Sequence, residues 1–354
     1  MARKKAKKSS TNWKKIVAII VVIIVCLGGV SAWELYSMIY RSNVEFKADE
    51  KYFYIPTGSS FQEVSNALVE GGILLNQASF DWVAEQKNYK LNVKAGRYKL
   101  ERGMSNNELV NLLRSGEQEP VMITFNNVRF KEELAGKVAS YIEADSTQII
   151  SLLNDSDYAN NFGFNTTTLF TLFLPNTYEF WWNTSADEFV ERMAAEYKKF
   201  WTAERKQKAN KLGLSQSEVS ILASIVQKET TKNDEKPTVA GVYLNRLKKG
   251  MLLQADPTLV YANKDFEARR VLNWHKEIDS PYNTYKYKGL PPGPICLPSI
   301  QSIDAVLNAK SHSYLYFCAK ADGSGYHSFA STYNEHLKNA REFQRELNKR
   351  KVYR

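Results

Sequence analysis

An unbroken apolar run near the start of the chain is its strongest hydrophobic signal. Ile16–Trp33, IVAIIVVIIVCLGGVSAW, contains no charged residue. About 18–20 apolar residues in a helix span the hydrocarbon core of a bilayer, and Tyr36 and Tyr40 follow as aromatic residues do at a membrane interface. We therefore predict one uncleaved transmembrane helix over residues 16–36. A cleaved signal peptide is the alternative, which the length of the run and the missing small-x-small cleavage site disfavour.

Periodicity after the apolar run predicts a small module over residues 45–118. Tyr52–Pro56 reads as a strand, and Ser60 precedes a helix that Gly71 and Gly72 end. A second helix, a second strand and a third helix are predicted over residues 79–86, 96–100 and 107–114. The order of strand, paired helices and strand resembles a LysM-like module, which implies contact with glycan strands. A purely supporting role is the alternative.

The pattern over residues 119–345 mixes strands and helices and predicts a larger domain. We expect a strand and a helix at its start, one long helix in its middle, and a hairpin with a closing helix at its end. In order, these are Glu119–Phe125, Lys131–Glu143, Ala186–Lys211, His312–Phe317 with Tyr326–Phe329, and the segment from Thr332 onward. The predicted fold class is α+β: a membrane helix, a small βααβ module and a larger mixed catalytic domain.

The positive charge of the chain is concentrated before the apolar run. The net charge is +10, and residues 1–15 hold seven lysines and arginines and no acid, which leaves about +3 for the rest. A basic flank marks the cytoplasmic side of a membrane helix. We expect residues 1–15 to be a cytoplasmic tail and the chain from about residue 41 to lie outside the cell (inner) membrane. The near balance of charge elsewhere argues against a nucleic-acid partner.

Cysteines and histidines predict neither a metal site nor a disulfide framework. Beyond the apolar run the chain has Cys296 and Cys318, for which a disulfide and a chance pair of thiols are equally good interpretations. No metal-ligand spacing occurs among the Cys and the four His, and we expect no cofactor. His327 is a candidate acid–base partner, although a surface or capping role is commoner, and His336 is taken as structural.

The stretch LASIVQKET places one carboxyl group on an otherwise apolar helix face. The face consists of Leu222, Ile225, Val226 and Glu229, which recur at three- and four-residue steps. An apolar setting raises the pKa of a carboxyl group toward the range of about 6–7 that a general acid needs. Glu229 is therefore the candidate catalytic acid. A helix-end glutamate that faces solvent or pairs with Lys228 or Lys232 is the alternative.

Two segments after Glu229 combine polar side chains with a rigid backbone. Asp256, followed by proline, is explained by a helix N-cap; the alternative places Gln254 and Asp256 in a cleft beside Glu229. Loops 280–285 and 289–298 hold five of the ten prolines of the chain. Such rigidity suits a preorganised site.

Four motifs occur in the order found in the endolytic murein transglycosylases, the YceG-like family. They are LASIVQKET, GMLLQADPTLVYA, SPYNTYKYKGLPPGPI and LYF…DGSGYHSF…YNEH. The chain resembles this family over nearly its whole length. The resemblance implies a single-pass membrane enzyme that cleaves nascent peptidoglycan within glycan strands, with Glu229 as the acid. It also implies substrate contacts for Gln254, Asp256, Ser280, Tyr282, Asn283, Thr284 and Tyr285.

Three departures from the family pattern leave Glu229 untouched. Phe170-Thr171 stand where the family has Glu-Gly, Asn176 where it has Asp, and Leu297-Pro298-Ser299 where it has Asn-Pro-Gly. The first two put any role for acids around residue 176 in doubt.

A lytic transglycosylase needs a single carboxylic acid, because the 6-hydroxyl of N-acetylmuramic acid (MurNAc) is the nucleophile; a hydrolase needs two carboxyl groups. Glu229 would protonate the oxygen between MurNAc and N-acetylglucosamine (GlcNAc) and leave a 1,6-anhydroMurNAc end. Dipoles from Gln254, Ser280, Asn283 and Tyr285 would stabilise the oxocarbenium-like transition state. The expected role is to set strand length during wall synthesis, with glycan strands, the membrane and peptidoglycan synthases as partners.

Two other classes of function fit parts of the sequence. A catalytically inactive glycan-binding scaffold of the synthesis machinery would bind strands without forming anhydro ends. A pyridoxal-phosphate lyase would need a buried Schiff-base lysine and a phosphate cradle. Lys228 lies one residue off the apolar face, and no glycine-rich phosphate loop is evident in the sequence.

Overall fold

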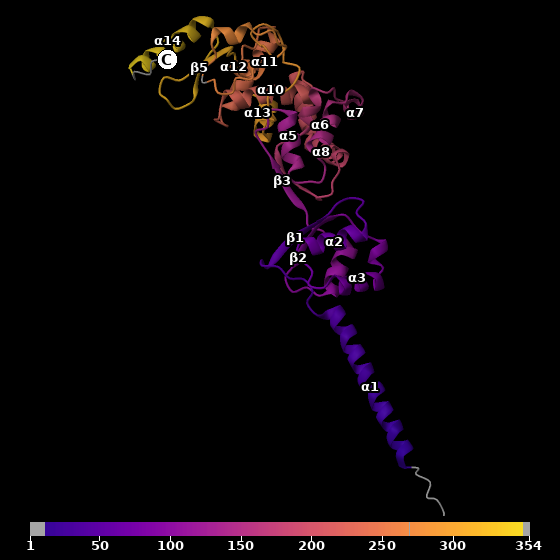
Figure 1. The fold of residues 1–354 in the computed structure, drawn as a ribbon. Helices are drawn as coiled ribbons and strands as arrows, with labels where there is room; N and C mark the ends of the chain where they lie inside the picture. The colour runs from indigo at the N-terminus through magenta and orange to yellow at the C-terminus, as the bar shows by residue number, and fades with distance from the viewer. Residues whose placement is uncertain (1–10, 269, 350–354) are drawn as a thin grey trace, which may run out of the picture. The chain divides into compact units, whose positions relative to one another are not determined.

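The structure, a computed structural model, describes residues 11–268 and 270–349. It divides the chain into two compact units, which are described separately (Figure 1). The first is Met1–Pro120 with Trp181–Asn183, and the second is Val121–Phe180 with Thr184–Arg354. The first ten residues of the predicted basic tail lie outside the described residues.

The predicted apolar helix is α1, Thr11–Tyr40. Its portion Trp13–Tyr40 is long and apolar enough to cross a membrane, and the most apolar 18-residue window within it has a mean hydropathy of 2.8 and is not buried. Asn106 donates a hydrogen bond from Nδ2 to the carbonyl oxygen of Met38 at 2.8 Å, which ties the end of α1 to the rest of the first unit.

The first unit contains a two-stranded sheet and three further helices. The strands β1, Glu50–Ile55, and β2, Gly96–Glu101, are antiparallel. Its helices are α2 Phe61–Glu70, α3 Gln77–Gln86 and α4 Asn106–Ser115, with a 3-10 turn η1 Tyr89–Leu91. Ser60 and Ser105 both close capping boxes, which confirms the predicted helix starts. The order of strand, two helices and strand is confirmed, and the likeness to a LysM-like module stays a prediction.

The second unit is mostly helical and has two strand pairs. The strand β3, Val121–Phe125, pairs with β4, Asn176–Phe180, and β5, Tyr316–Ala319, pairs with β6, His327–Ala330, both antiparallel. Its helices are α5 Lys131–Ala139, α6 Ser146–Asn154, α7 Ser156–Asn161, α8 Ala186–Phe200, α9 Ala203–Leu212, α10 Gln216–Glu229, α11 Lys236–Lys248, α12 Asp256–Asn263, α13 Ile300–Leu307 and α14 Tyr333–Lys349, with 3-10 turns η2 Thr168–Leu172 and η3 Asn273–Glu277.

The prediction of one long helix over Ala186–Lys211 is wrong, because the chain breaks there between α8 and α9. Trp201 lies at the break and is buried, with its ring against those of Tyr197 and Phe200. Thr202 then accepts a hydrogen bond at Oγ1 from the Arg205 amide and caps α9. The burial of the Trp201 ring and the cap at Thr202 therefore favour a break, even though the apolar periodicity of the sequence continues across it.

The helix α10 is central to the second unit and carries Glu229 as its last residue. It contacts α9, α11, α12 and α13, and the labels of the last three lie close to its own in Figure 1. Ser215 caps its start, and every residue from Val219 to Val226 is buried. Because the helix runs through the core, its last residue is delivered into the protein and not into bulk solvent.

Candidate active site

The carboxyl group of Glu229 meets a buried phenol. The hydroxyl of Tyr243, on α11, donates a hydrogen bond to Glu229 Oε1, and Tyr243 is only 1% exposed. Glu229 itself is partly buried and lines a pocket of about 270 Å³. An acid that is held on one side and open to a pocket on the other has the placement that proton transfer to a ligand requires.

Burial raises the pKa of Glu229 from 4.5 to about 7. The negative charge of Asp256 acts in the same direction, whereas the hydrogen bond from Tyr243 and the charge of Arg246 act against it. Burial is the largest of these effects because it removes water from the carboxylate form. About half of the Glu229 carboxyl groups therefore carry a proton near neutral pH.

Arg246, also on α11, is the buried cation that acts on Glu229. Its guanidinium donates hydrogen bonds to the carbonyl oxygens of Leu315 at 2.6 Å and Leu253 at 2.7 Å. Neither Tyr243 nor Arg246 was among the predicted site residues. The signal was present, because Val239, Tyr243 and Arg246 recur at steps of four and three and form a buried face of α11.

Asp256 is not a helix cap. The N-cap position of α12 is Ala255, and no side chain caps this helix. Asp256 instead accepts a hydrogen bond at Oδ1 from the Tyr285 hydroxyl at 2.5 Å, and it lines the same pocket as Glu229. The N-cap prediction is therefore wrong, and the alternative position beside Glu229 is what the structure shows. A partner 29 residues away in sequence determines where this side chain lies.

The segment before α12 is fixed to the loop that carries Tyr285. Gln254 is exposed, has a left-handed backbone with φ of 50°, and donates its amide to the carbonyl of Thr284 at 3.0 Å. Thr284 is buried and accepts a hydrogen bond at Oγ1 from the Ala255 amide at 3.0 Å. These bonds bring Tyr285 to Asp256.

Asn283 is fully buried, and its polar atoms bond to the backbone of its own loop and of the segment just before it. Its Nδ2 donates to the carbonyl oxygens of Lys276 at 2.9 Å and Ile278 at 2.8 Å. Its Oδ1 accepts the Tyr285 amide at 3.0 Å. The placement of Asn283 and Thr284 thus differs from the prediction that they face a substrate. Both side chains hold the loop, and such burial is not visible in the motif itself.

Ser280 and Tyr282 line a second pocket, of about 560 Å³. Arg129 and Tyr261 line both this pocket and the Glu229 pocket, so the two adjoin. The rings of Tyr261 and Tyr282 lie 4.8 Å apart. Gly293 permits the close packing here, since a Cβ atom on it would lie 2.9 Å from the Tyr282 hydroxyl. Aromatic walls with a few polar groups are typical of ligand sites.

The proline-rich loop packs directly on α10. The Ile295 amide donates to Ser224 Oγ at 3.0 Å, and the Ser299 amide donates to Gln227 Oε1 at 2.6 Å. The rigid loop therefore holds the last turns of the helix that ends in Glu229. Between these contacts, Cys296 is buried, and the thiols of Cys296 and Cys318 are both free.

Comparisons with known proteins place this geometry in a family. The profile of the YceG-like family matches residues 53–342. The chain belongs to the YceG-like family. The "Endolytic murein transglycosylase" of Bacillus subtilis (strain 168) is 32% identical over 306 residues, which are 80% of this chain and 82% of that protein. The protein of the same name from Streptococcus pneumoniae serotype 2 is 29% identical over 342 residues, 87% of this chain and 61% of that protein.

A solved structure agrees with the family assignment. The crystal structure of a yceG-like protein from Listeria monocytogenes has a TM-score of 0.54 and 27% identity, and the match covers 82% of this chain and 99% of that one. In this YceG-like chain, Phe170, which stands where the family pattern has Glu, lines the second pocket as a buried ring. That part of the cleft wall is therefore apolar here.

The two lysines near Glu229 have partners other than its carboxylate. Lys228 donates from Nζ to Asn127 Oδ1 at 2.8 Å in an exposed contact, and Lys232 lies over the ring of Tyr326. Across residues 11–268 and 270–349, neither lysine forms an ion pair with Glu229. Lys228 also lacks the enclosed setting that a Schiff-base lysine needs.

Proposed function

We propose that this YceG-like chain is a membrane-anchored endolytic lytic transglycosylase of peptidoglycan. The observation that carries the proposal is Glu229, whose carboxyl group has a pKa raised to about 7 and lines a pocket that adjoins an aromatic cleft. The names of the relatives from Bacillus subtilis and Streptococcus pneumoniae support the substrate class.

The chemistry needs only the proton of Glu229. The acid protonates the glycosidic oxygen between MurNAc and GlcNAc, and the bond from MurNAc C1 to that oxygen breaks. The 6-hydroxyl of the same MurNAc then attacks C1 and gives its proton to the Glu229 carboxylate, which leaves a 1,6-anhydro ring and restores the acid. The hydrogen bond from Tyr243 and the charge of Arg246 stabilise the carboxylate between the two transfers.

Asp256 and the Ser280–Tyr285 loop complete the proposed site. The charge of Asp256 favours the protonated form of Glu229 before the reaction. Dipoles from Gln254, Ser280 and Tyr285 face the developing oxocarbenium ion, and Tyr282 and Tyr261 contact the flat faces of sugar rings. Asn283 and Thr284 hold these groups in place from beneath.

The helix α1 supports the membrane part of the proposal. Its apolar portion is long enough to span a bilayer, and the basic residues near the N terminus support a cytoplasmic N terminus, because such residues favour the cytoplasmic side of a membrane helix. The second unit then acts on strands outside the membrane as synthases extend them, and its cuts set strand length.

Digestion of glycan strands tests the proposed activity. Full-length protein in detergent micelles is incubated with uncrosslinked strands, and 1,6-anhydroMurNAc ends are counted by mass spectrometry. We expect Glu229→Gln to release them at least about 100-fold more slowly, because it has no transferable proton. The control is Glu267→Gln, at an exposed glutamate, which should match the wild type.

Each alternative has its own outcome in that digestion. Equal release by the wild type and Glu229→Gln would rule out the acid. Strand binding without anhydro ends would indicate an inactive scaffold, and ordinary reducing ends would indicate a hydrolase.

A further inference from the structure

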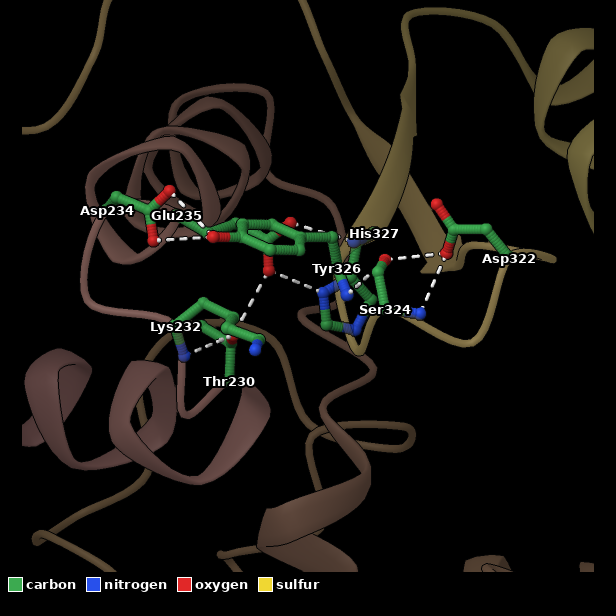
Figure 2. Close-up of polar contacts among 8 residues, drawn as sticks. All are labelled: Thr230, Lys232, Asp234, Glu235, Asp322, Ser324, Tyr326 and His327. Atoms are coloured by element: carbon green, nitrogen blue, oxygen red, sulfur yellow. Dashed lines mark hydrogen bonds and ion pairs between the residues drawn. The ribbon is translucent and has the colours of Figure 1, made fainter.

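A second buried glutamate, Glu235, lies in the turn between α10 and α11 and binds three groups. It is 6% exposed. Its Oε1 accepts the His327 amide at 2.7 Å, and its Oε2 accepts the Thr230 hydroxyl at 3.0 Å and lies 2.7 Å from His327 Nδ1 (Figure 2). A buried carboxylate is costly unless its oxygens are bonded. These contacts therefore join the end of α10, the start of α11 and the strand β6.

Thr230 connects Glu235 to the backbone of the catalytic acid. It follows Glu229 directly and is the C-cap of α10. Its amide donates to the Val226 carbonyl at 3.4 Å. Its Oγ1 accepts the Lys232 amide at 3.1 Å (Figure 2). The bond to Glu235 therefore fixes the peptide at which the chain leaves the catalytic helix.

His327 connects Glu235 to the side chain of the catalytic acid. Its ring meets the Phe317 ring edge-on at 5.2 Å, and Phe317 meets the Tyr243 ring edge-on at 5.9 Å. Tyr243 in turn donates its hydroxyl to Glu229. The contacts close a ring of six residues, in order Glu229, Tyr243, Phe317, His327, Glu235 and Thr230.

From this closed ring we propose that Glu235 and His327 are positioning residues for the acid–base step at Glu229. Glu235 fixes the backbone of the acid through Thr230, and His327 fixes its phenol partner through Phe317. The proposal rests on the proposed function, since it takes Glu229 as the acid. Neither residue lines the pocket that Glu229 faces, so neither is assigned a contact with substrate.

Loosening the ring has two consequences that can be measured. A catalytic group displaced by about 1 Å slows the reaction about 100-fold. Loss of the Tyr243 hydrogen bond also removes an effect that lowers the pKa of Glu229, so the alkaline limb of the rate profile moves to higher pH. Among the described residues, the other charged or titratable groups near Glu229 or in its pocket are Arg246, Asp256, Tyr261, Tyr285, Arg129, Lys228 and Arg270.

The same hairpin offers a matched control. Tyr326, next to His327, donates its hydroxyl to Asp234 Oδ2 at 3.0 Å, and Lys232 Nζ lies 5.1 Å from the centre of its ring (Figure 2). This contact joins the same turn to the same hairpin but is exposed and outside the ring of six. Asp234→Asn therefore changes a neighbouring carboxylate without touching the proposed path.

The test measures anhydro-end release by the full-length protein in micelles against strand concentration and pH. For Glu235→Ala and His327→Phe we expect kcat to fall about 10- to 100-fold, KM to stay within about twofold, and the alkaline limb to move to higher pH. Glu235→Gln, which keeps an oxygen acceptor, should recover part of kcat. Asp234→Asn should match the wild type in all three.

Each outcome decides the proposal. Wild-type kcat in folded Glu235→Ala and His327→Phe would overturn it, and so would a fall in kcat with an unmoved alkaline limb, which indicates a structural role alone. If Glu235→Ala does not fold, kcat, KM and the alkaline limb are measured for His327→Phe and Glu235→Gln instead. Wild-type protein that forms no anhydro ends would instead contradict the proposed function itself.

Discussion

Glu229 and Glu235 lie on either side of one short turn, and the protein surrounds them differently. Glu235 has hydrogen-bond donors at both oxygens, whereas, of the hydrogen bonds that the structure describes, Glu229 receives one, from Tyr243. Burial penalises a carboxylate, and donors offset that penalty. The number of donors, more than burial, therefore separates a carboxyl group that faces a pocket from one that anchors a turn.

The sharpest way to test this difference is to replace each carboxyl group by an amide. The pKa of Glu229 is raised from 4.5 to about 7 by folding, so the stability that its protonated form contributes is complete below pH 4.5 and is lost as the pH rises through 7. At pH 8 the buried charge costs up to about 3 kcal/mol. Urea unfolding should show Glu229→Gln more stable than the wild type at pH 8 and equal to it at pH 4.

The same replacement at Glu235 should change the stability at pH 8 in the opposite direction. Glu235→Gln weakens charge-assisted bonds to Thr230 and His327, which we expect to lower the free energy of unfolding by about 1–3 kcal/mol at pH 8. Two variants shifted in the same direction would contradict the distinction between acid and anchor.

A smaller effect is expected from the phenol that binds Glu229. Tyr243→Phe keeps the ring against Phe317 and removes the hydroxyl. Because the hydrogen bond from this hydroxyl lowers the pKa of Glu229, its loss raises that pKa. The alkaline limb of activity should therefore move to higher pH, with kcat reduced about tenfold for a lost hydrogen bond of about 1.4 kcal/mol. Tyr326→Phe, which removes the exposed phenol bonded to Asp234, is the control. A limb that moves to lower pH would refute this role of Tyr243.

Local signals in the sequence were sufficient for the helices that bring Glu229 to its place. The capping boxes at Ser60, Ser105 and Ser215 involve residues three apart, so the starts of α2, α4 and α10 can be recognised without tertiary structure. The apolar face that ends at Glu229 is equally local, because it depends on helical periodicity alone.

The partners of the acid could not be found in this way. In the sequence, Asp256 before proline looks fully explained as a cap, and the hydrogen bond from the Tyr285 hydroxyl, 29 residues away, shows where its side chain lies instead. The break after α8 depends on the burial of Trp201 in the core. Asn283 belongs to a motif whose residue types indicate a polar site, while the structure turns its side chain inward. These features depend on contacts between segments far apart in the sequence.

The smallest expected effect concerns Asp256. Its negative charge raises the pKa of Glu229, as a contribution smaller than burial, so Asp256→Asn should move the alkaline limb to lower pH. The loss of activity should be about two- to fivefold at pH 8 and less at pH 6, where Glu229 stays protonated. Initial rates across that range measure it. A larger loss at pH 6 than at pH 8 would show that Asp256 acts in another way.

The protonation of Glu229 can be observed directly by ¹³C NMR of side-chain carboxyl groups in selectively labelled full-length protein. The Glu229 signal is assigned by its absence from Glu229→Gln, and its shift is followed between pH 4 and pH 9. The account predicts a titration midpoint at about 7. A midpoint near 4.5, the ordinary value for a glutamate, would contradict it.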